Sequence, residues 1–305
     1  MRRLLGVVVG MSLVLRALGA EPPVAGLPLA PDTRVMVVAP HPDDETIAAG
    51  GVLAYAAARR MPVRVVFVTN GDGYVEVVGG TRGTASDADF KAYGLRRRQE
   101  ALAATARLGL ARTDVAFLGF PDGGLDQLWH AHWARPYTSP FTREGGPPYP
   151  DAVDPEATYA GKDLTAILVK VIGEFRPTVL ILPHPADTHL DHAAAAAFII
   201  EAVTRLQMRR MLDISPLLLG YLVHYPGWPA VRAPNLQHVH PASTITARWL
   251  GKDVDARSAT AKEAALVAYE TQLAVMRGFL RGFLRSNELF AVIDARMRDR
   301  IAAVH

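Results

Sequence analysis

The chain of 305 residues contains no cysteine. Disulfide bonds, a thiolate nucleophile and cysteine-bound zinc are therefore excluded, and any metal must be held by histidine or carboxylate side chains. The chain also lacks an excess of charge of one sign, because its 33 Lys and Arg residues are nearly balanced by 30 Asp and Glu residues. This balance does not favour a nucleic-acid-binding surface. The spaced Arg277, Arg281 and Arg285 are interpreted as a solvated helix face, with a membrane-surface helix as the alternative.

Long apolar runs are missing too, since a stable membrane span needs about 20 apolar residues. The run Leu4–Leu15 is shorter, follows Arg2 and Arg3, and precedes the small residues 17–20. This order resembles a secretory signal peptide. We therefore expect residues 1–22 to be a signal peptide and the protein to be exported to the periplasm or the medium. An uncleaved membrane anchor is the alternative.

Downstream, Val-rich strand patterns alternate with helical patterns. This alternation predicts an α/β fold, a Rossmann-like and mostly parallel sheet with helices on both faces. The expected strands are 34–39, 63–69, 114–118, 178–182 and 217–223, and the expected helices are 46–60, 95–108, 163–175 and 192–207.

Two later segments depart from this rhythm. Residues 127–162 are rich in Pro, Gly, Tyr and Trp and show no period, which is typical of a functional loop. Residues 261–285 read as one long helical stretch, followed by a short strand-like segment. We expect a single domain over residues 23–305, with 127–162 as an insertion that forms a lid or a pocket wall.

Histidine and aspartate follow the first expected strand, in the motif APHPDDE. His41 and Asp44 are three residues apart at a strand-to-helix turn, so both could face one divalent ion. Asp43 would lie beside that ion, where a general base is needed. A helix N-cap is the alternative role for the two aspartates.

A second cluster, HPADTHLDH, follows the fourth expected strand. His189 and His192 are three residues apart, with Asp191 between them. One more imidazole would complete a three-ligand site that keeps an open position. Sites in open α/β sheets form outside the carboxyl ends of the strands, where both clusters are expected. Neither a GxGxxG turn nor a GxSxG elbow is present, which disfavours a dinucleotide-binding oxidoreductase and a serine hydrolase.

Taken in order, the motifs resemble those of the PIG-L/LmbE deacetylases. The resemblance runs over residues 34–290 and implies an LmbE-like fold and a zinc-dependent deacetylase. It implies zinc bound by His41, Asp44 and His192, although such ligands accept other divalent ions. The matching motifs are APHPDDE, TNGDG, RxxE, LGFPDGGL, HPADTHLDH, KEAALVAYETQ and ELF.

The same resemblance implies roles for five further residues. Asp43 would be the general base and later the proton donor. His189, charged and oriented by Asp191, would stabilise the oxyanion. Arg97 would bind substrate or form an ion pair, and Asp122 would lie at the rim of the cleft.

One position departs from the pattern of some relatives, which have a tyrosine just before the second cluster. Asp187 and Thr188 stand there in this chain. A tyrosine role would therefore fall to another residue, such as Tyr74, or be absent.

The expected reaction is removal of an acetyl group from an N-acylated amino sugar, such as an N-acetylglucosamine derivative, or from a related amide. The substrate would be a small molecule or a glycan, with aromatic residues of the insertion stacking on sugar rings. Alternatives are hydrolysis of another acyl ester or amide at the same site, and a non-catalytic carbohydrate-binding relative. The natural substrate and the oligomeric state stay open. The aromatic residues are Trp129, Trp133, Tyr137 and Tyr149.

Overall fold

The computed structural model describes residues 24–78, 85–229 and 237–302. Within these residues one eight-stranded sheet has the order β1-β7-β8-β6-β5-β2-β3-β4. All neighbouring strands are parallel except β8, which is antiparallel to β6 and β7. The predicted mostly parallel sheet is therefore confirmed. The strands are β1 (Ala25–Gly26), β2 (Val35–Ala39), β3 (Val63–Thr69), β4 (Val115–Phe120), β5 (Val179–Pro183), β6 (Leu217–Tyr221), β7 (Trp249–Asp253) and β8 (Asn287–Val292).

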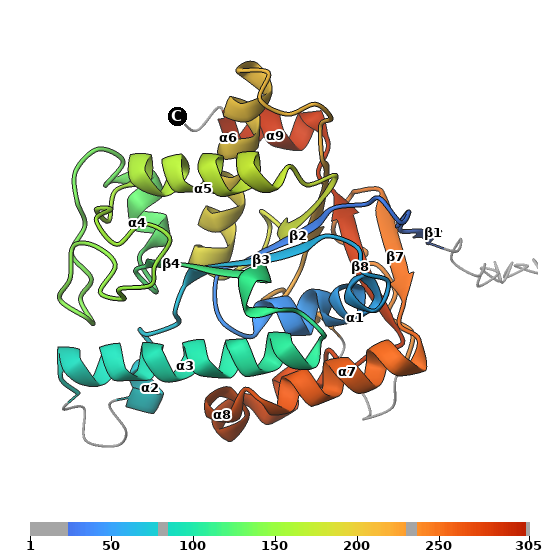
Figure 1. Cartoon of the computed structure of the whole chain (residues 1–305), viewed down its shortest axis with the longest axis horizontal. Coiled ribbons are helices and arrows are strands. Elements are labelled where there is room, and N and C mark those ends of the chain that lie inside the picture. Colours follow the sequence, from blue (N-terminus) through green and yellow to red (C-terminus); the bar gives the residue numbers. More distant parts are fainter. Residues whose placement is uncertain (1–23, 79–84, 230–236, 303–305) are drawn as a thin grey trace, which may run out of the picture.

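Helices cover both faces of the sheet, as the sequence predicts. Figure 1 shows α4, α5, α6 and α9 on one face and α1, α3, α7 and α8 on the other. The helices are α1 (Asp44–Ala58), α2 (Val75–Val78), α3 (Asp87–Arg107), α4 (Leu125–His130), α5 (Gly161–Phe175), α6 (Leu190–Met208), α7 (Ala256–Val267), α8 (Glu270–Arg281) and α9 (Ala295–Ala302).

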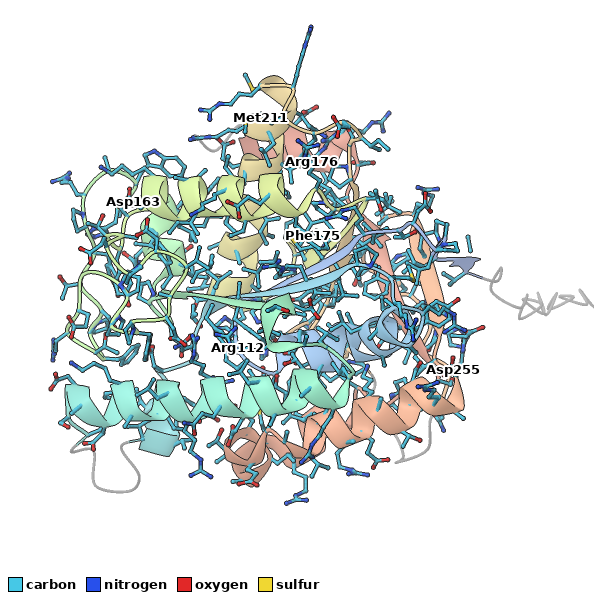
Figure 2. All side chains as sticks on the ribbon, in the orientation of Figure 1. Arg112, Asp163, Phe175, Arg176, Met211 and Asp255 are labelled. Atoms are coloured by element: carbon cyan, nitrogen blue, oxygen red, sulfur yellow. The ribbon has the colours of Figure 1, made fainter. Side chains whose placement is uncertain are left out.

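The sheet separates two apolar cores, and the strands supply both. In β2, Val35 and Val37 point into one core while Met36 and Val38 point into the other, all fully buried. Strands covered on both faces need apolar residues at every position, which explains their unbroken apolar runs. Figure 2 shows side chains filling the space between the sheet and both helix layers.

The chain order places a switch point beside β2. From β2 the chain moves outward through β3 and β4, then returns to β5 on the other side of β2 and continues to β6. Connections leaving the carboxyl ends of β2 and β5 diverge there, which opens a crevice between them. Both histidine clusters follow these two strands.

Some helix boundaries differ from those predicted. Helix α3 begins at Asp87, before the predicted Leu95, because Ser86 and Asp89 form a capping box. The predicted long helix over 261–285 is two helices, α7 and α8, separated at Ala268 and Tyr269. Tyr269 leaves the helical conformation and its hydroxyl bonds to a residue of α1.

The insertion begins within α4, and its residues 131–160 contain no helix or strand. Buried contacts hold it against β4. The Tyr159 hydroxyl donates to the Gly119 carbonyl at 3.0 Å, and the Val153 amide donates to Phe117 at 2.9 Å.

The apolar contact between α6 and the insertion yields a stability prediction. Phe198 is fully buried, edge-on to Trp129 with ring centroids 4.9 Å apart and stacked on Trp133. Phe198→Ala leaves a cavity there and should lower the free energy of unfolding by about 3–5 kcal/mol. Urea denaturation measures the change. Met208→Ala, on the same helix but 79% exposed, is the control and should stay within about 0.5 kcal/mol of wild type.

Candidate metal-centred active site

The turn between β2 and α1 brings a carboxylate and an imidazole together. Asp44 begins α1, and its Oδ2 accepts a hydrogen bond from the His41 amide at 2.9 Å. The same oxygen lies 3.3 Å from His41 Nδ1. The first turn of the helix thereby folds the carboxylate back over the end of the strand.

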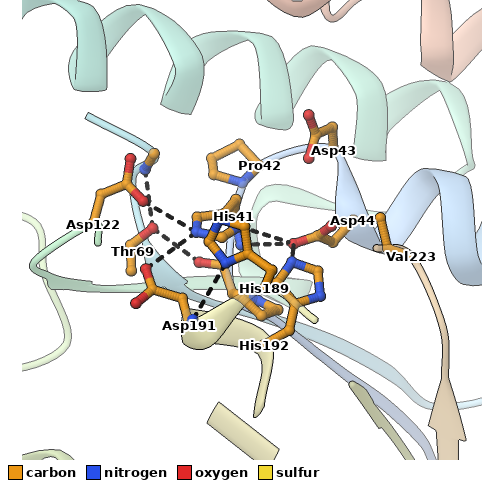
Figure 3. A network of polar contacts seen from close by, with 12 residues as sticks. His41, Pro42, Asp43, Asp44, Thr69, Asp122, His189, Asp191, His192 and Val223 are labelled. Carbon is orange, nitrogen blue, oxygen red and sulfur yellow. Dashed lines mark hydrogen bonds and ion pairs between the residues drawn. The ribbon is translucent and has the colours of Figure 1, made fainter. Parts of the chain in front are cut away.

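The turn between β5 and α6 adds a second imidazole to this point. His192 Nε2 lies 3.2 Å from Asp44 Oδ2. Donor atoms of His41, Asp44 and His192 all lie within 4.8 Å of one another, and all three residues are buried (Figure 3). The structure brings the three predicted ligands together. Donor atoms of His41, His189 and Asp191 also lie within 4.8 Å of one another.

The donor set fits a divalent metal ion. His192 is fully buried, yet neither ring nitrogen makes a directed hydrogen bond to any described residue. Buried polar nitrogens rarely lack a hydrogen-bond partner. Two imidazoles and one carboxylate also match the ligand chemistry of catalytic divalent metals.

Carboxylates hold the outer nitrogens of both rings. His41 Nε2 lies 3.0 Å from Asp122 Oδ1 and 3.3 Å from Asp191 Oδ2, and His192 Nδ1 lies 3.4 Å from Asp187 Oδ2. Such outer carboxylates orient metal-binding imidazoles and make them better donors. The contact of Asp187 with His192 was not predicted from the sequence. The position of Asp187 two residues before the histidine pair was the available signal.

The protonation of the two rings reflects this negative surrounding. Burial lowers the pKa of His41, but Asp122 and further carboxylate contacts raise it well above the usual value. Burial likewise opposes charge on His192, while Asp44 and Asp187 raise its pKa to about 9. Burial would raise the pKa of Asp44, yet the charge of His192 holds it well below the usual value. The site therefore favours positive charge between the two rings.

Two expectations about aspartates need correction. The Asp191 carboxylate does not orient the His189 ring. It accepts from the amides of Gly123 and Leu125 at 2.7 and 3.0 Å and faces His41, because the start of α6 turns it toward the loop after β4. Asp122 does not lie at an open rim. It is 9% exposed, and it accepts from the Gly73 amide at 2.7 Å as well as contacting His41.

Asp43 lies next to the three donors in a strained conformation, with φ of 125°. Such backbone costs about 1–3 kcal/mol for a residue with a side chain. Arg97 holds it: Nη2 lies 3.2 Å from Asp43 Oδ2 and donates to the Pro42 carbonyl, while Nη1 donates to Gly71. Burial raises the pKa of Asp43 to about 7 despite the charge of Arg97.

His189 and His224 complete the polar part of the site. Their ring centroids are 5.0 Å apart. Burial and the charge of His41 lower the pKa of His189 to about 4, which favours a neutral ring where a charged ring was expected. Its Nδ1 accepts from the Asp191 amide at 3.2 Å, which leaves the proton on Nε2. Burial and the charge of His192 lower the pKa of His224 to about 4 as well.

These residues line a cavity of about 330 Å³. Helix α8 provides an apolar wall of Met276, Phe279 and Leu280, which was not predicted from the sequence. The insertion contributes Phe141. The further lining residues are His41, Asp43, Asp44, Ile47, Gly73, Tyr74, Arg97, Asp122, Gly123, His189, Val223, His224 and Gln272.

The aromatic residues chosen for sugar stacking lie elsewhere. Trp129 and Trp133 pack on Phe198 beneath α6, and Tyr149 is buried with its hydroxyl donating to Asp72 at 2.6 Å. Tyr137 does not line the cavity either. The expected stacking surface is therefore wrong, since these rings build the core under the insertion.

Comparisons with known proteins identify the family of this chain. The family model described as PIG-L, GlcNAc-PI de-N-acetylase, matches residues 36–203. A 1D-myo-inositol 2-acetamido-2-deoxy-alpha-D-glucopyranoside deacetylase of Mycobacterium sp. strain KMS is 31% identical over 63% of this chain and 56% of its own length. The enzyme of the same name from Mycolicibacterium gilvum strain PYR-GCK is 30% identical over 86% and 88%. The chain thus spans about half the length of the first relative.

A solved structure shares the fold. N,N'-diacetylchitobiose deacetylase from Pyrococcus horikoshii superimposes with a TM-score of 0.54 at 16% identity, covering 85% of this chain and 83% of that one. The chain belongs to the PIG-L family, whose deacetylases are metal-dependent hydrolases of the amide bonds of acetylated sugars.

The same comparisons correct the predicted export. The inositol deacetylases that the chain resembles are cytoplasmic enzymes, which contradicts the expectation of a periplasmic or secreted protein. The predicted signal peptide, residues 1–22, lies outside the described residues. Among the described helices, none is long and apolar enough to cross a membrane.

Asp187 provides a test of the metal site. Burial would raise its pKa, but the close contact with His192 Nδ1 lowers it to about 2, so the residue is charged. Asp187→Asn removes that charge and should weaken binding of Zn²⁺ about 10–100-fold, measured by competition with a chelating dye. Asp213→Asn, an exposed aspartate paired with Arg176, is the control. Equal affinities of the two variants would exclude a role for Asp187 at the metal.

Proposed function

We propose that the protein is a zinc-dependent hydrolase that removes the acetyl group from an N-acetylated amino sugar. One observation carries the proposal: the three candidate ligands converge at one buried point, and Asp43 and His189 face the same cavity. A binding protein would need neither a carboxylate of raised pKa nor an imidazole with a free donor.

Zinc would be held by His41, Asp44 and His192, since it accepts both imidazole and carboxylate donors. When bound, it lowers the pKa of water toward about 7 and polarises a carbonyl oxygen. The other catalytic tasks fall to residues of the chain.

Asp43 acts as general base and then as general acid. Its carboxylate accepts a proton from the attacking water and later gives it to the leaving nitrogen, so that the amide and water become an amine and acetate. Arg97 keeps the carboxylate aimed into the cavity. The neutral His189 donates from Nε2 to the carbonyl oxygen as that oxygen gains negative charge. Asp122 and Asp191 hold the ring of His41 and, in this proposal, do not touch the substrate.

The base assignment is tested by Asp43→Asn, which keeps the size of the side chain but cannot accept the proton. We expect kcat for acetate release to fall about 10²–10⁴-fold with the zinc content unchanged. Asp154→Asn, an exposed aspartate of the insertion, controls for the loss of a carboxylate. A variant that keeps its activity, or a wild type that binds no divalent metal, would contradict the proposal.

The apolar wall on α8 favours a substrate with an apolar group beside the amino sugar. We expect octyl or phenyl glycosides of N-acetylglucosamine to have a KM at least about tenfold below that of the free sugar, because Met276 and Phe279 cover the added group. Phe279→Ala should remove this difference. Val275→Ala, 50% exposed on α8 and not lining the cavity, should preserve it. O-acetyl esters and amides with longer N-acyl chains in the same panel test the other acyl substrates.

A further inference from the structure

Several polar residues of the C-terminal part are buried although none is a candidate ligand or proton carrier. They come from two sequence motifs, KEAALVAYETQ and ELF, to which the proposed chemistry assigns no task. Each makes a buried contact with α1, α3 or β8. The residues are Lys262, Tyr269, Thr271, Gln272 and Glu288, all at most 6% exposed.

Tyr269 connects the break between α7 and α8 to the turn between β2 and α1 that carries Asp43, here called the base loop. Its hydroxyl donates to Glu45 Oε1 at 2.6 Å, across a sequence separation of 224 residues. Glu45 Oε2 accepts from the backbone amide of Asp43 at 3.2 Å. Glu45 and Tyr269 are both fully buried. The contact therefore runs from the C-terminal motif to the residue with the strained φ.

A second contact supports α1 where the helix is irregular. The helix is interrupted at Ala49, which has φ of −138°. The amides of Gly51 and Val52 donate to the Glu288 carboxylate at 2.7 and 2.8 Å. Lys262 Nζ lies 2.6 Å from the same carboxylate and donates to the Ile47 carbonyl at 2.9 Å. A buried ion pair thus contacts α1 on both sides of the irregularity.

The beginning of α8 also binds the helix that carries Arg97. The Thr271 amide and hydroxyl donate to Glu100 of α3 at 3.0 and 2.6 Å, and Gln272 donates to Tyr93 at 2.7 Å. Glu100 is three residues beyond Arg97, on the same helix. Both supports of Asp43, its amide through Glu45 and its carboxylate through Arg97, therefore lead to residues 269–272.

We propose that Tyr269 and Glu45 are positioning residues that hold Asp43 in its strained, cavity-facing conformation. The inference rests on the proposed role of Asp43 as base. A strained backbone conformation persists only where several surrounding contacts hold it in place. With the amide of Asp43 released, the residue relaxes and its carboxylate leaves the reacting position.

The test is Tyr269→Phe, which removes one hydroxyl and keeps the ring. We expect kcat to fall at least about tenfold, with KM, zinc content and melting temperature near those of wild type. Tyr159→Phe is the matched control. Its fully buried hydroxyl donates to the Gly119 carbonyl away from the cavity, and kcat should be unchanged. A Tyr269→Phe variant with wild-type kcat would overturn the proposal.

Glu45→Met provides a second variant, because it keeps the length of the side chain and removes both acceptor oxygens. The hydrogen bonds from the Asp43 amide and from the Tyr269 hydroxyl are then both lost. We expect kcat to fall at least as far as in Tyr269→Phe. If Glu45→Met matches wild type in kcat, the contact to the Asp43 amide is not a support.

A measurement without turnover separates this proposal from the proposed function. Amide hydrogen exchange of peptides covering residues 41–47 should speed up in Tyr269→Phe and not in Tyr159→Phe. If wild type hydrolyses no acetylated sugar, the function fails while faster exchange still supports the positioning contact. Equal exchange in the two variants would overturn the contact.

Discussion

The active-site end of the molecule depends on one buried carboxylate, that of Asp44, between two imidazoles. A buried charge is costly unless it is paired and hydrogen-bonded. Asp44 meets this condition through its contacts with His41 and His192. Each ring in turn contacts a further carboxylate with its other nitrogen. The outermost carboxylates end on backbone amides, those of Gly73, Gly123, Leu125 and Val223. Charge at the centre is thus stabilised by fixed dipoles of the loops.

The sheet order explains why these loops meet. Loops after β2, β3, β4, β5 and β6 all leave from the carboxyl edge of the sheet. Strand β2 lies between β3 and β4 on one side and β5 and β6 on the other. Each loop then supplies one part: His41 and Asp44, Gly73, Asp122, His192 with Asp187, and His224. The antiparallel β8 contributes differently, because its Glu288 reaches the interior of α1.

Most of the strands could be predicted from the sequence, because buried parallel strands are continuously apolar. The three candidate ligands were implied by the resemblance of the motifs to a known family, and the structure brings these residues together. The carboxylates that contact the rings of His41 and His192 could not be predicted. Whether Asp191 faces His189 or His41 depends on the turn at the start of α6 and on amides after β4, which sequence spacing does not encode. Trp129 and Trp133 looked suited to stacking on sugars, but packing against Phe198 decides their place. The apolar wall of α8 comes from residues distant in sequence from both histidine clusters. The export prediction rested on residues 1–22 alone and was wrong.

The contact between Tyr269 and Glu45 has a consequence for biosynthesis. All candidate metal ligands belong to the first 192 residues, so a nascent chain carries the complete ligand set long before it is finished. The support of the base loop is made only when the segment around residue 269 has left the ribosome and docked. Contacts of such long sequence separation form late, because closing the large loop costs entropy first. The order of synthesis would therefore deliver the candidate metal ligands early and the supported conformation of Asp43 last.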